Sequence, residues 1–297
     1  MTSKSSSRKK SSKLLSSSRP SQPSRRSTIS NLSSKATRTL IRSHHTLQKR
    51  LAQAEASGDD LLVARIKSEI EKAGGLAKYQ QASIQGQSAL RGGDSSKLLV
   101  EWFRELDPSL FRSNDRKKLR LLEVGALRPD NVCSRCGLFE VERIDLHSQH
   151  KIIQQQDFME RPLATSNDQR FDVVSLSLVV NYVPDAKGRG DMLKRVSLFL
   201  RTQQEHLYDN DSAHKALFPG LFLVLPSPCV TNSRYLDEQR LEDMLESLGF
   251  TMLKKKLSPK LMYYYLVLST DLPKTSKSFG KLEIRNGAKR NNFAIIV

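Results

Sequence analysis

The stretch L-R-L-L-E-V-G, residues 119–125, ends in a glycine, and Asp145 follows that glycine twenty residues later. A short apolar run that stops at glycine predicts a buried strand followed by a tight turn. Glycine also lets a ligand approach the backbone, because no Cβ stands in the way. An acid at the end of the next strand can accept hydrogen bonds from both hydroxyls of a ribose. The pattern therefore predicts a parallel α/β sheet whose carboxyl edge binds a nucleoside.

The cofactor that fits this pattern carries no pyrophosphate. A single glycine replaces the G-x-G-x-x-G phosphate cradle, which disfavours NAD(P) and FAD and favours S-adenosylmethionine. We assign Gly125, Asp145 and the adjoining Glu123 to the cofactor site. Asp157 follows a weaker third strand and can accept from the adenine amine, with Phe158 beside the ring. The alternatives are a structural turn with a surface acid, and a helix N-cap at Asp157.

From this stretch onward strands and helices alternate, which is typical of a parallel sheet covered on two faces. The last two strands are adjacent and predict an antiparallel hairpin. We expect further strands at 141–145, 151–154, 171–178, 220–225, 251–257 and 261–268, and helices at 190–204 and 235–248.

Most of the net charge of +18 comes from the N-terminal part of the chain. The first 54 residues hold 13 Lys and Arg and no acid, whereas the other 243 hold 36 basic and 31 acidic residues. Residues 1–35 contain 15 serines and cannot bury enough apolar surface to order themselves. We predict a disordered basic tail over residues 1–38 that serves as a nuclear or nucleolar address and attracts RNA phosphates. The alternative is a solvated tail without function.

Three further segments follow this tail. Apolar residues at 3–4 spacing predict a helical extension over residues 39–110, with a break at 57–60 where Asp59 or Asp60 caps the second helix. The sheet domain is expected at 111–270 and a C-terminal tail at 271–297.

Basic residues of the extension offer a second candidate contact with RNA. Arg42, Lys49 and Arg50 are candidate phosphate contacts, although these helices can equally serve only to pack on the sheet domain.

Several kinds of protein are excluded or disfavoured. No apolar run approaches the length of a membrane span, and the N-terminus lacks the apolar core of a secretory signal. Three cysteines cannot build a disulfide framework. Cys133 and Cys136 resemble half of a zinc site, but no second pair follows them. We therefore expect a monomer that uses neither a metal nor a membrane.

The strand at 171–178 leads into S-L-V-V-N-Y-V-P, which is the candidate acceptor site. Asn181 can accept a hydrogen bond from an exocyclic amine, and Tyr182 can stack on a base. Lys187, Arg189 and Arg195 follow and are candidate phosphate contacts. The alternative is a plain strand end with a turn.

Several linked blocks carry a family resemblance. They are L-L-E-V-G-A-L, R-I-D-L-H-S, Q-D-F-M-E-R-P, F-D-V-V-S-L-S-L-V-V-N-Y-V-P, and upstream G-G-L-A-K-Y-Q-Q-A-S-I-Q-G-Q and R-G-G-D-S-S-K. Over about residues 74–270 the chain resembles the fungal nucleolar 25S rRNA adenine-N(1)-methyltransferase family. The resemblance implies a Rossmann-like class I methyltransferase fold, S-adenosylmethionine as cofactor at Gly125 and Asp145, and large-subunit rRNA or a pre-ribosome as partner in the nucleolus.

Two other functions stay open. The same family resembles the animal SAMTOR proteins, which sense S-adenosylmethionine without transferring a methyl group. A methyltransferase that acts on protein, or on another base position, also fits the residues. The basic tail argues against a sensor, because a sensor of a small molecule needs no arm that attracts RNA.

Overall fold

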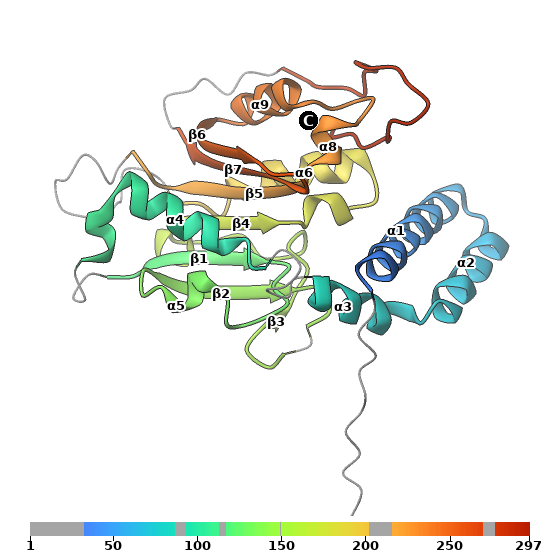
Figure 1. Ribbon diagram of the computed structural model, residues 1–297, viewed down its shortest axis with the longest axis horizontal. Helices are drawn as coiled ribbons and strands as arrows, with labels where there is room; N and C mark the ends of the chain where they lie inside the picture. The colour runs from blue at the N-terminus through green and yellow to red at the C-terminus, as the bar shows by residue number, and fades with distance from the viewer. Residues whose placement is uncertain (1–32, 87–92, 113–116, 149, 202–215, 270–276) are drawn as a thin grey trace, which may run out of the picture. The chain divides into compact units, whose positions relative to one another are not determined.

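A seven-stranded sheet forms the centre of the computed structural model, which describes residues 33–86, 93–112, 117–148, 150–201, 216–269 and 277–297. The strand order is β3-β2-β1-β4-β5-β7-β6, with β1 to β5 parallel and β7 antiparallel to both neighbours (Figure 1). The strands are β1 Leu119–Val124, β2 Phe139–Asp145, β3 Gln154–Gln155, β4 Val173–Ser177, β5 Gly220–Pro226, β6 Phe250–Leu257 and β7 Leu261–Leu268. The predicted mostly parallel sheet with a C-terminal antiparallel hairpin is confirmed.

Helices cover both faces of the sheet. The helices that follow the extension are α4 Ser96–Leu106, α5 Val132–Arg135, α6 Ala186–Val196, α8 Pro228–Thr231 and α9 Glu238–Ser247, with 3-10 turns η1 Pro108–Phe111, η2 Asn167–Gln169 and η3 Val180–Tyr182. Leu121 packs in the core cluster with α4 and α5, whereas its neighbour Leu122 packs with α6, α8 and α9. Successive residues of a strand point to opposite faces, so the continuous apolar runs of the central strands are buried on both sides.

Two elements differ from the sequence-based expectation. The third strand is only the exposed pair Gln154–Gln155, because residues 151–153 form a turn in which the Ile153 N–H donates to the His150 carbonyl at 2.9 Å. The helix expected at 190–204 begins earlier, at Ala186, where Asp185 accepts from the Gly188 N–H at 2.7 Å. It ends at Val196 because the chain then turns back to pair with Phe171, and residues 202–204 lie outside the described residues.

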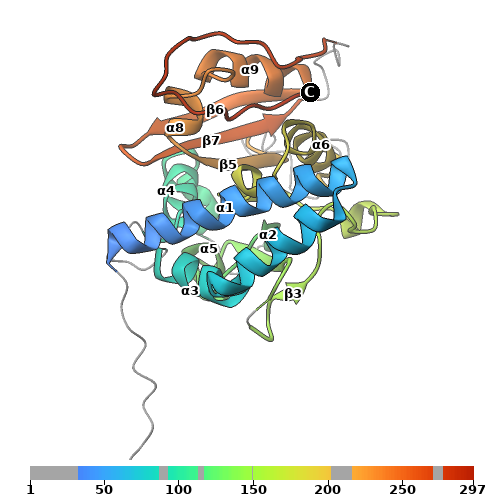
Figure 2. The same cartoon turned by 90° about the vertical axis from the view of Figure 1, so that its right-hand side faces the viewer.

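The N-terminal extension consists of three helices, α1 Ser34–Ser57, α2 Asp60–Lys72 and α3 Gly75–Gly86. Figure 2 shows α1 and α2 side by side across the carboxyl edge of the sheet. Gly58 ends α1 with φ +68°, and Asp59 caps α2 by accepting from the Leu62 N–H at 2.9 Å. Helix α1 starts inside the stretch assigned to the tail, and α3 falls within the expected helical extension, although Leu76, Tyr79 and Ala82 are too few apolar residues to show a clear period.

The described part of the C-terminal segment, residues 277–297, packs on the sheet domain instead of forming a separate tail. Phe279, Phe293 and Ile295 lie in the core cluster with α6, α8 and α9. The segment approaches α6 so closely that a Cβ at Gly190 would lie 1.7 Å from the Ile296 carbonyl oxygen. Scattered apolar residues without a period gave no indication of this packing.

Two of the arginines considered as phosphate contacts hold main-chain carbonyls instead. Arg189 is 3% exposed and donates to the carbonyl oxygens of Val183, Pro184 and Ala294 at 2.7–2.9 Å. Arg195 likewise donates to main-chain carbonyls. Arg189 is buried and three of its five N–H donors are engaged in this way, so its assignment to a phosphate is wrong, whereas Arg195 is only partly buried and its assignment stays a prediction.

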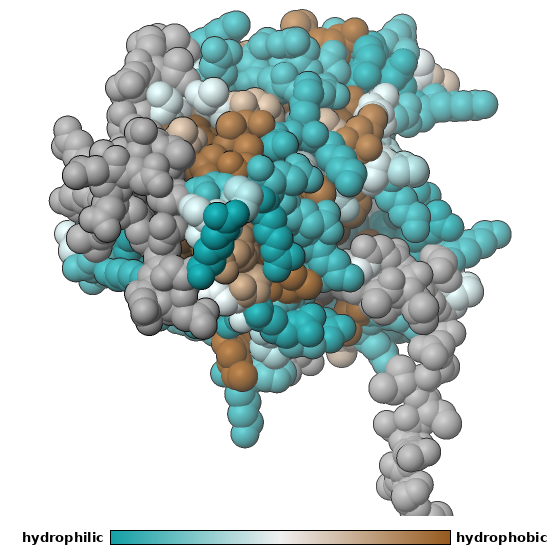
Figure 3. Space-filling model, turned by 60° about the vertical axis from the view of Figure 1, so that its left-hand side comes forward, coloured by the Kyte–Doolittle hydropathy of each residue, from teal (hydrophilic) through white to brown (hydrophobic). Residues whose placement is uncertain are grey.

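The side that Figure 1 shows at the left carries the amino ends of the parallel strands. Figure 3 shows hydrophilic side chains over most of it, with apolar side chains at the surface in separate groups.

Within the described ranges, no helix combines the length and the apolar character needed to cross a membrane.

We predict that Arg189→Met destabilises the fold by about 3 kcal/mol, because it leaves buried carbonyl oxygens without donors. The free energy of unfolding in urea measures this. Lys187→Met is the matched control on the same helix, where the exposed ammonium pairs with Asp191 and with no other described acid, and should contribute little. Equal stability of the two variants would contradict a structural role for Arg189.

Candidate functional site

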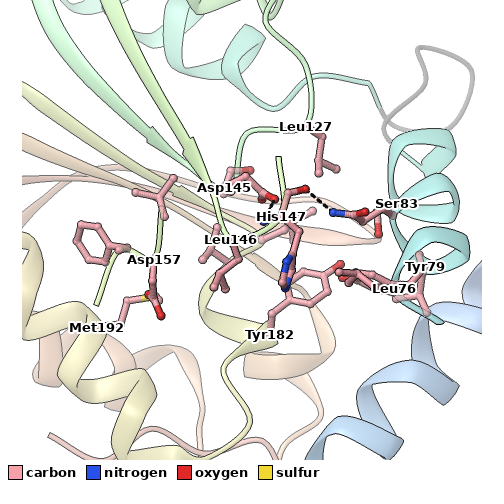
Figure 4. Close-up of a pocket in the computed structure, with 18 of the residues that line it drawn as sticks. Leu76, Tyr79, Ser83, Leu127, Asp145, Leu146, His147, Asp157, Tyr182 and Met192 are labelled. Atoms are coloured by element: carbon pink, nitrogen blue, oxygen red, sulfur yellow. Dashed lines mark hydrogen bonds between the residues drawn. The ribbon is translucent and has the colours of Figure 1, made fainter. Parts of the chain in front are cut away.

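A cavity of about 360 Å³ lies at the carboxyl edge of the sheet, where ligands bind in open α/β folds. The ends of β1, β2 and β4 form its floor, and residues of α1 and α3 form part of its wall (Figure 4). Its volume falls within the range of small-molecule sites. In Figure 4, Asp157 and Met192 lie at one end of the cavity and Leu76 and Tyr79 at the other.

Gly125 lines the cavity at the end of β1 and has a φ of +74°. A Cβ at this position would lie 2.6 Å from the Cγ2 of Val179, which follows β4. The Gly125 N–H donates to the Ile144 carbonyl of β2 at 2.8 Å. The glycine is therefore required both by its backbone conformation and by close packing against Val179, and it joins the ends of three strands.

Asp145 is the last residue of β2 and also lines the cavity. Its Oδ1 accepts from the His147 N–H at 2.9 Å, which fixes the carboxyl group. The other carboxylate oxygen has no hydrogen-bond partner within the described chain. Burial raises the pKa of Asp145 above its ordinary value. A half-buried carboxylate with a free oxygen is suited to accept hydrogen bonds from ligand hydroxyls.

Asp157 and Phe158 lie next to each other after β3, and both line the cavity. The Asp157 Oδ1 accepts from the Met159 N–H at 2.7 Å, so this carboxyl group caps a turn rather than a helix. Phe158 is 2% exposed and packs against Phe199 in the core, with ring centroids 5.3 Å apart. Phe158 thus supports the end of the cavity at which Asp157 lies.

Glu123 is not among the residues that line the cavity. It points to the other side of β1, where it accepts a hydrogen bond from the Asn131 amide and lies 3.9 Å from the Arg143 Nε. Burial, the largest cause, raises the pKa of Glu123 to about 7. The structure therefore places it behind the wall of the cavity, and not in the cavity as the sequence had suggested.

We predict that Glu123→Gln removes a pH dependence of stability. The folded protein holds the Glu123 proton up to a pH of about 7, whereas the unfolded chain releases it near 4.5, so the wild type loses stability as pH rises through this window. Relative to the wild type, the variant should gain about 3 kcal/mol between pH 4.5 and pH 7.5. Urea unfolding across this pH range measures it, and parallel curves would contradict the burial of this carboxyl group.

An aromatic cluster joins the extension to the part of the cavity that Tyr182 lines. Tyr182 of η3 lies against His45 of α1, with ring centroids 4.3 Å apart, and against Tyr79 of α3, at 5.8 Å. His44 stacks on Tyr79 at 4.3 Å. Burial, the first cause, lowers the pKa of His45 to about 4 and raises that of both tyrosines. The cluster is therefore uncharged near neutral pH.

Asn181 precedes Tyr182 in η3 but is not among the cavity-lining residues. Its amide oxygen is buried and accepts no hydrogen bond from the described residues. Leu178 directly follows β4 and lines the cavity. Its φ is +59°, which is a strained conformation for a leucine. Such strain is concentrated at functional sites.

The sequence did not reveal the contribution of α3 to the cavity. Leu76, Tyr79 and Ser83 line it, and Gln80 also donates a hydrogen bond to the His147 carbonyl beside Asp145. All four residues lie in the block G-G-L-A-K-Y-Q-Q-A-S-I-Q-G-Q. The block therefore marked this segment as part of the family resemblance, but it did not show that the segment lines the cavity. Lys260, at the turn between β6 and β7, was also missed.

The cysteines give no sign of a metal centre. Cys133 is buried, and the Cys136 thiol donates to the Cys133 carbonyl at 3.3 Å. The part of the chain that the structure describes contains no group of three or more His, Cys, Asp or Glu side chains placed to hold an ion.

The strand order and the cavity at the carboxyl edge define the class of protein: a Rossmann-like class I S-adenosylmethionine-dependent methyltransferase. Residues 64–295 match the family described as 25S rRNA (adenine(2142)-N(1))-methyltransferase, Bmt2. The chain belongs to this family.

Two curated relatives are similar over most of their length. The 25S rRNA adenine-N(1) methyltransferase of Schizosaccharomyces pombe is 39% identical over 257 residues, which cover 86% of this chain and 89% of the relative. The 25S rRNA (adenine(2142)-N(1))-methyltransferase of Saccharomyces cerevisiae is 38% identical over 256 residues, covering 84% and 69%.

Solved structures of similar fold are more distant in sequence. The 16S rRNA methyltransferase RmtF in complex with S-adenosyl-L-homocysteine is 10% identical, with a TM-score of 0.42 over 78% of this chain and 98% of that one. The 1,6-didemethyltoxoflavin-N1-methyltransferase of Burkholderia thailandensis is 12% identical, with a TM-score of 0.39 over 65% and 88%.

Proposed function

We propose that this protein transfers a methyl group from S-adenosylmethionine to N1 of an adenine in 25S rRNA, during ribosome biogenesis in the nucleolus. The observation that carries the proposal is the family match over residues 64–295, a range that contains both Gly125 and Asp145 of the cavity.

The residues of the cavity fit the proposed cofactor. The uncommitted carboxylate oxygen of Asp145 would accept from the ribose hydroxyls, as expected at the end of β2. Asp157 would accept from the adenine amine, in the end of the cavity that Phe158 supports. Bound there, S-adenosylmethionine supplies an electrophilic methyl group on a sulfonium. Gly125 would shape the floor, and Glu123 would act only by supporting β1 from behind.

The acceptor chemistry requires positioning rather than a base. Adenine N1 carries its lone pair in the ring plane, so it can attack a methyl group without losing a proton. The chain would contribute by holding N1 in line with the methyl carbon and the sulfur. The Asn181 oxygen is buried beside Tyr182, outside the cavity lining, and has no partner in the described chain; it would have to turn toward the cavity to accept from the adenine amine, and that bond would strengthen as the base becomes cationic.

The target base must leave its helix, because N1 lies on the Watson–Crick edge. Tyr182 lines the cavity and would stack on the extruded base. Its ring already contacts His45 and Tyr79, so the extension would hold it in place for stacking.

RNA attraction would come from the N-terminal part of the chain. Residues 1–32 lie outside the described residues, but their Ser and basic composition supports a nucleolar address and contact with phosphates. In α1, Arg50 pairs with Glu69 at 3.0 Å, whereas Arg42 is exposed and pairs with no acid of the described chain. Lys49 is also exposed, and partial desolvation, the largest cause, lowers its pKa.

A non-catalytic sensor is not favoured. Both curated relatives are named as rRNA methyltransferases, and the acceptor side of the cavity has its own lining in addition to that of the cofactor side. The particle that serves as substrate would be large-subunit rRNA or a pre-ribosome, and the protein would act on it as a monomer.

We predict that the protein transfers the methyl group of labelled S-adenosylmethionine to large-subunit rRNA from cells that lack the protein. The label should then appear in 1-methyladenosine. Asp145→Ala should lower cofactor affinity by at least tenfold and abolish labelling at limiting cofactor, because it removes the ribose acceptor. Glu140→Ala is the control, since this residue is exposed on the same strand. Tight cofactor binding without label on rRNA or pre-ribosomes would favour a sensor.

A second prediction concerns the acceptor side. Asn181→Ala and Tyr182→Ala should each lower kcat by tenfold or more while cofactor affinity, measured by calorimetry, stays within about twofold, because these residues would touch only the acceptor. Wild-type turnover in both variants would mean that the acceptor base binds elsewhere.

A further inference from the structure

Charge is divided between two parts of the cavity. Asp145 ends β2 and Asp157 follows β3, near one edge of the sheet. Lys260 lines the cavity from the turn between β6 and β7, and β1, β4 and β5 lie between these two groups in the sheet. Lys260 is the single Lys or Arg among the described residues that line the cavity. A phosphate entering the site is therefore repelled at one side and attracted at the other.

The backbone at Lys260 is held firmly. The Lys260 carbonyl accepts from the Ser227 N–H, just after β5, at 2.8 Å. The next residue, Leu261, donates its N–H to the Ser258 Oγ at 3.0 Å, which closes the turn. Pairing of Leu261 with Pro226 fixes the turn beside the end of β5. The stem of the lysine therefore starts from a fixed point at the carboxyl edge.

Lys260 is exposed and forms no ion pair with any described residue, unlike Lys254 and Lys255 of the same hairpin. Lys254 pairs with Glu105 at 3.2 Å, and Lys255 pairs with Glu238 and Glu242 at 2.6 and 2.8 Å. A cation that no acid neutralises, on a rigid turn at a cavity, is available to an anion from outside the chain.

We propose that Lys260 is a positioning residue that contacts a backbone phosphate of the RNA strand carrying the target adenine. The inference rests on the proposed function, because an extruded adenine in the cavity leaves its phosphates at the opening. A phosphate placed at Lys260 would direct the nucleotide over Leu178 and Tyr182, away from the carboxylates of the cofactor side. The contact fixes the strand and reads no sequence.

The test compares Lys260→Ala and Lys260→Arg with Lys256→Ala in the full-length protein. Lys256 is the matched control, since it lies in the same hairpin, is exposed and pairs with no described acid, but does not line the cavity. The probe is an unmodified rRNA fragment that contains the target adenine. The measurements are its Kd as a function of salt, kcat and KM for methyl transfer, and the affinity for S-adenosylmethionine.

Lys260→Ala should raise the Kd and KM for RNA by about tenfold, reduce the slope of log K against log salt by about one, and leave kcat within about twofold. Lys260→Arg should restore the affinity, and Lys256→Ala should resemble the wild type. A merely structural role would not change the salt slope or be rescued by arginine.

Two outcomes would overturn the proposal. An unchanged RNA affinity and salt slope in Lys260→Ala would mean that no phosphate binds there. A loss of cofactor affinity with unchanged RNA affinity would assign Lys260 to the carboxylate of the cofactor instead. The RNA-binding measurements need no turnover, so they test this contact independently of the proposed function. If the wild type binds RNA through Lys260 but transfers no methyl group, the proposed function is contradicted and the contact at Lys260 is still supported.

Discussion

The turn at Gly125 is the constraint on which the site depends. The φ of +74° at Gly125 turns the chain away from β1. The side chain of Val179, which follows β4, packs against this position. Hydrogen bonds from Gly125 and Ala126 to the Ile144 carbonyl hold the same turn against β2. Asp145, the next residue of β2, is thereby placed beside the turn. A larger residue at 125 would separate the strand ends that together form the floor of the cavity.

The extension completes the site that the sheet begins. Helices α1 and α3 contribute Ile41, Tyr79 and Ser83 to the cavity wall, and their aromatic side chains pack on Tyr182. Burial keeps this cluster uncharged, as the lowered pKa of His45 and the raised pKa of Tyr79 indicate. Uncharged aromatic rings of this kind suit a site that a base enters from solvent, because the base can stack on them and the rings add no further positive charge to the site.

Charge is separated in a way that matches the chemistry of methyl transfer to a nucleotide. Among the described residues, one carboxylate oxygen of Asp145 and one of Asp157 have no partner where ribose hydroxyls and an amine are expected, and the one lysine among the lining residues lies beyond β5, at the turn of the hairpin. Arginines that the sequence leaves as candidates for RNA are used inside the protein: Arg189 holds the C-terminal segment to α6 through main-chain carbonyls. Composition alone therefore overstates how much positive charge faces the substrate.

The sequence by itself determined the elements with strong local patterns. Apolar runs predicted β1, β4, β5 and the C-terminal hairpin, and a glycine and an acid at strand ends identified Gly125 and Asp145 as cavity residues. The tertiary structure decided which residues meet across long stretches of chain: α3 at the cavity, Glu123 behind it, the C-terminal segment in the core and Lys260 at the end of β5. The physical reason is that periodicity reports which face of an element is buried, whereas its partner depends on contacts between segments far apart in sequence, and these leave no local pattern.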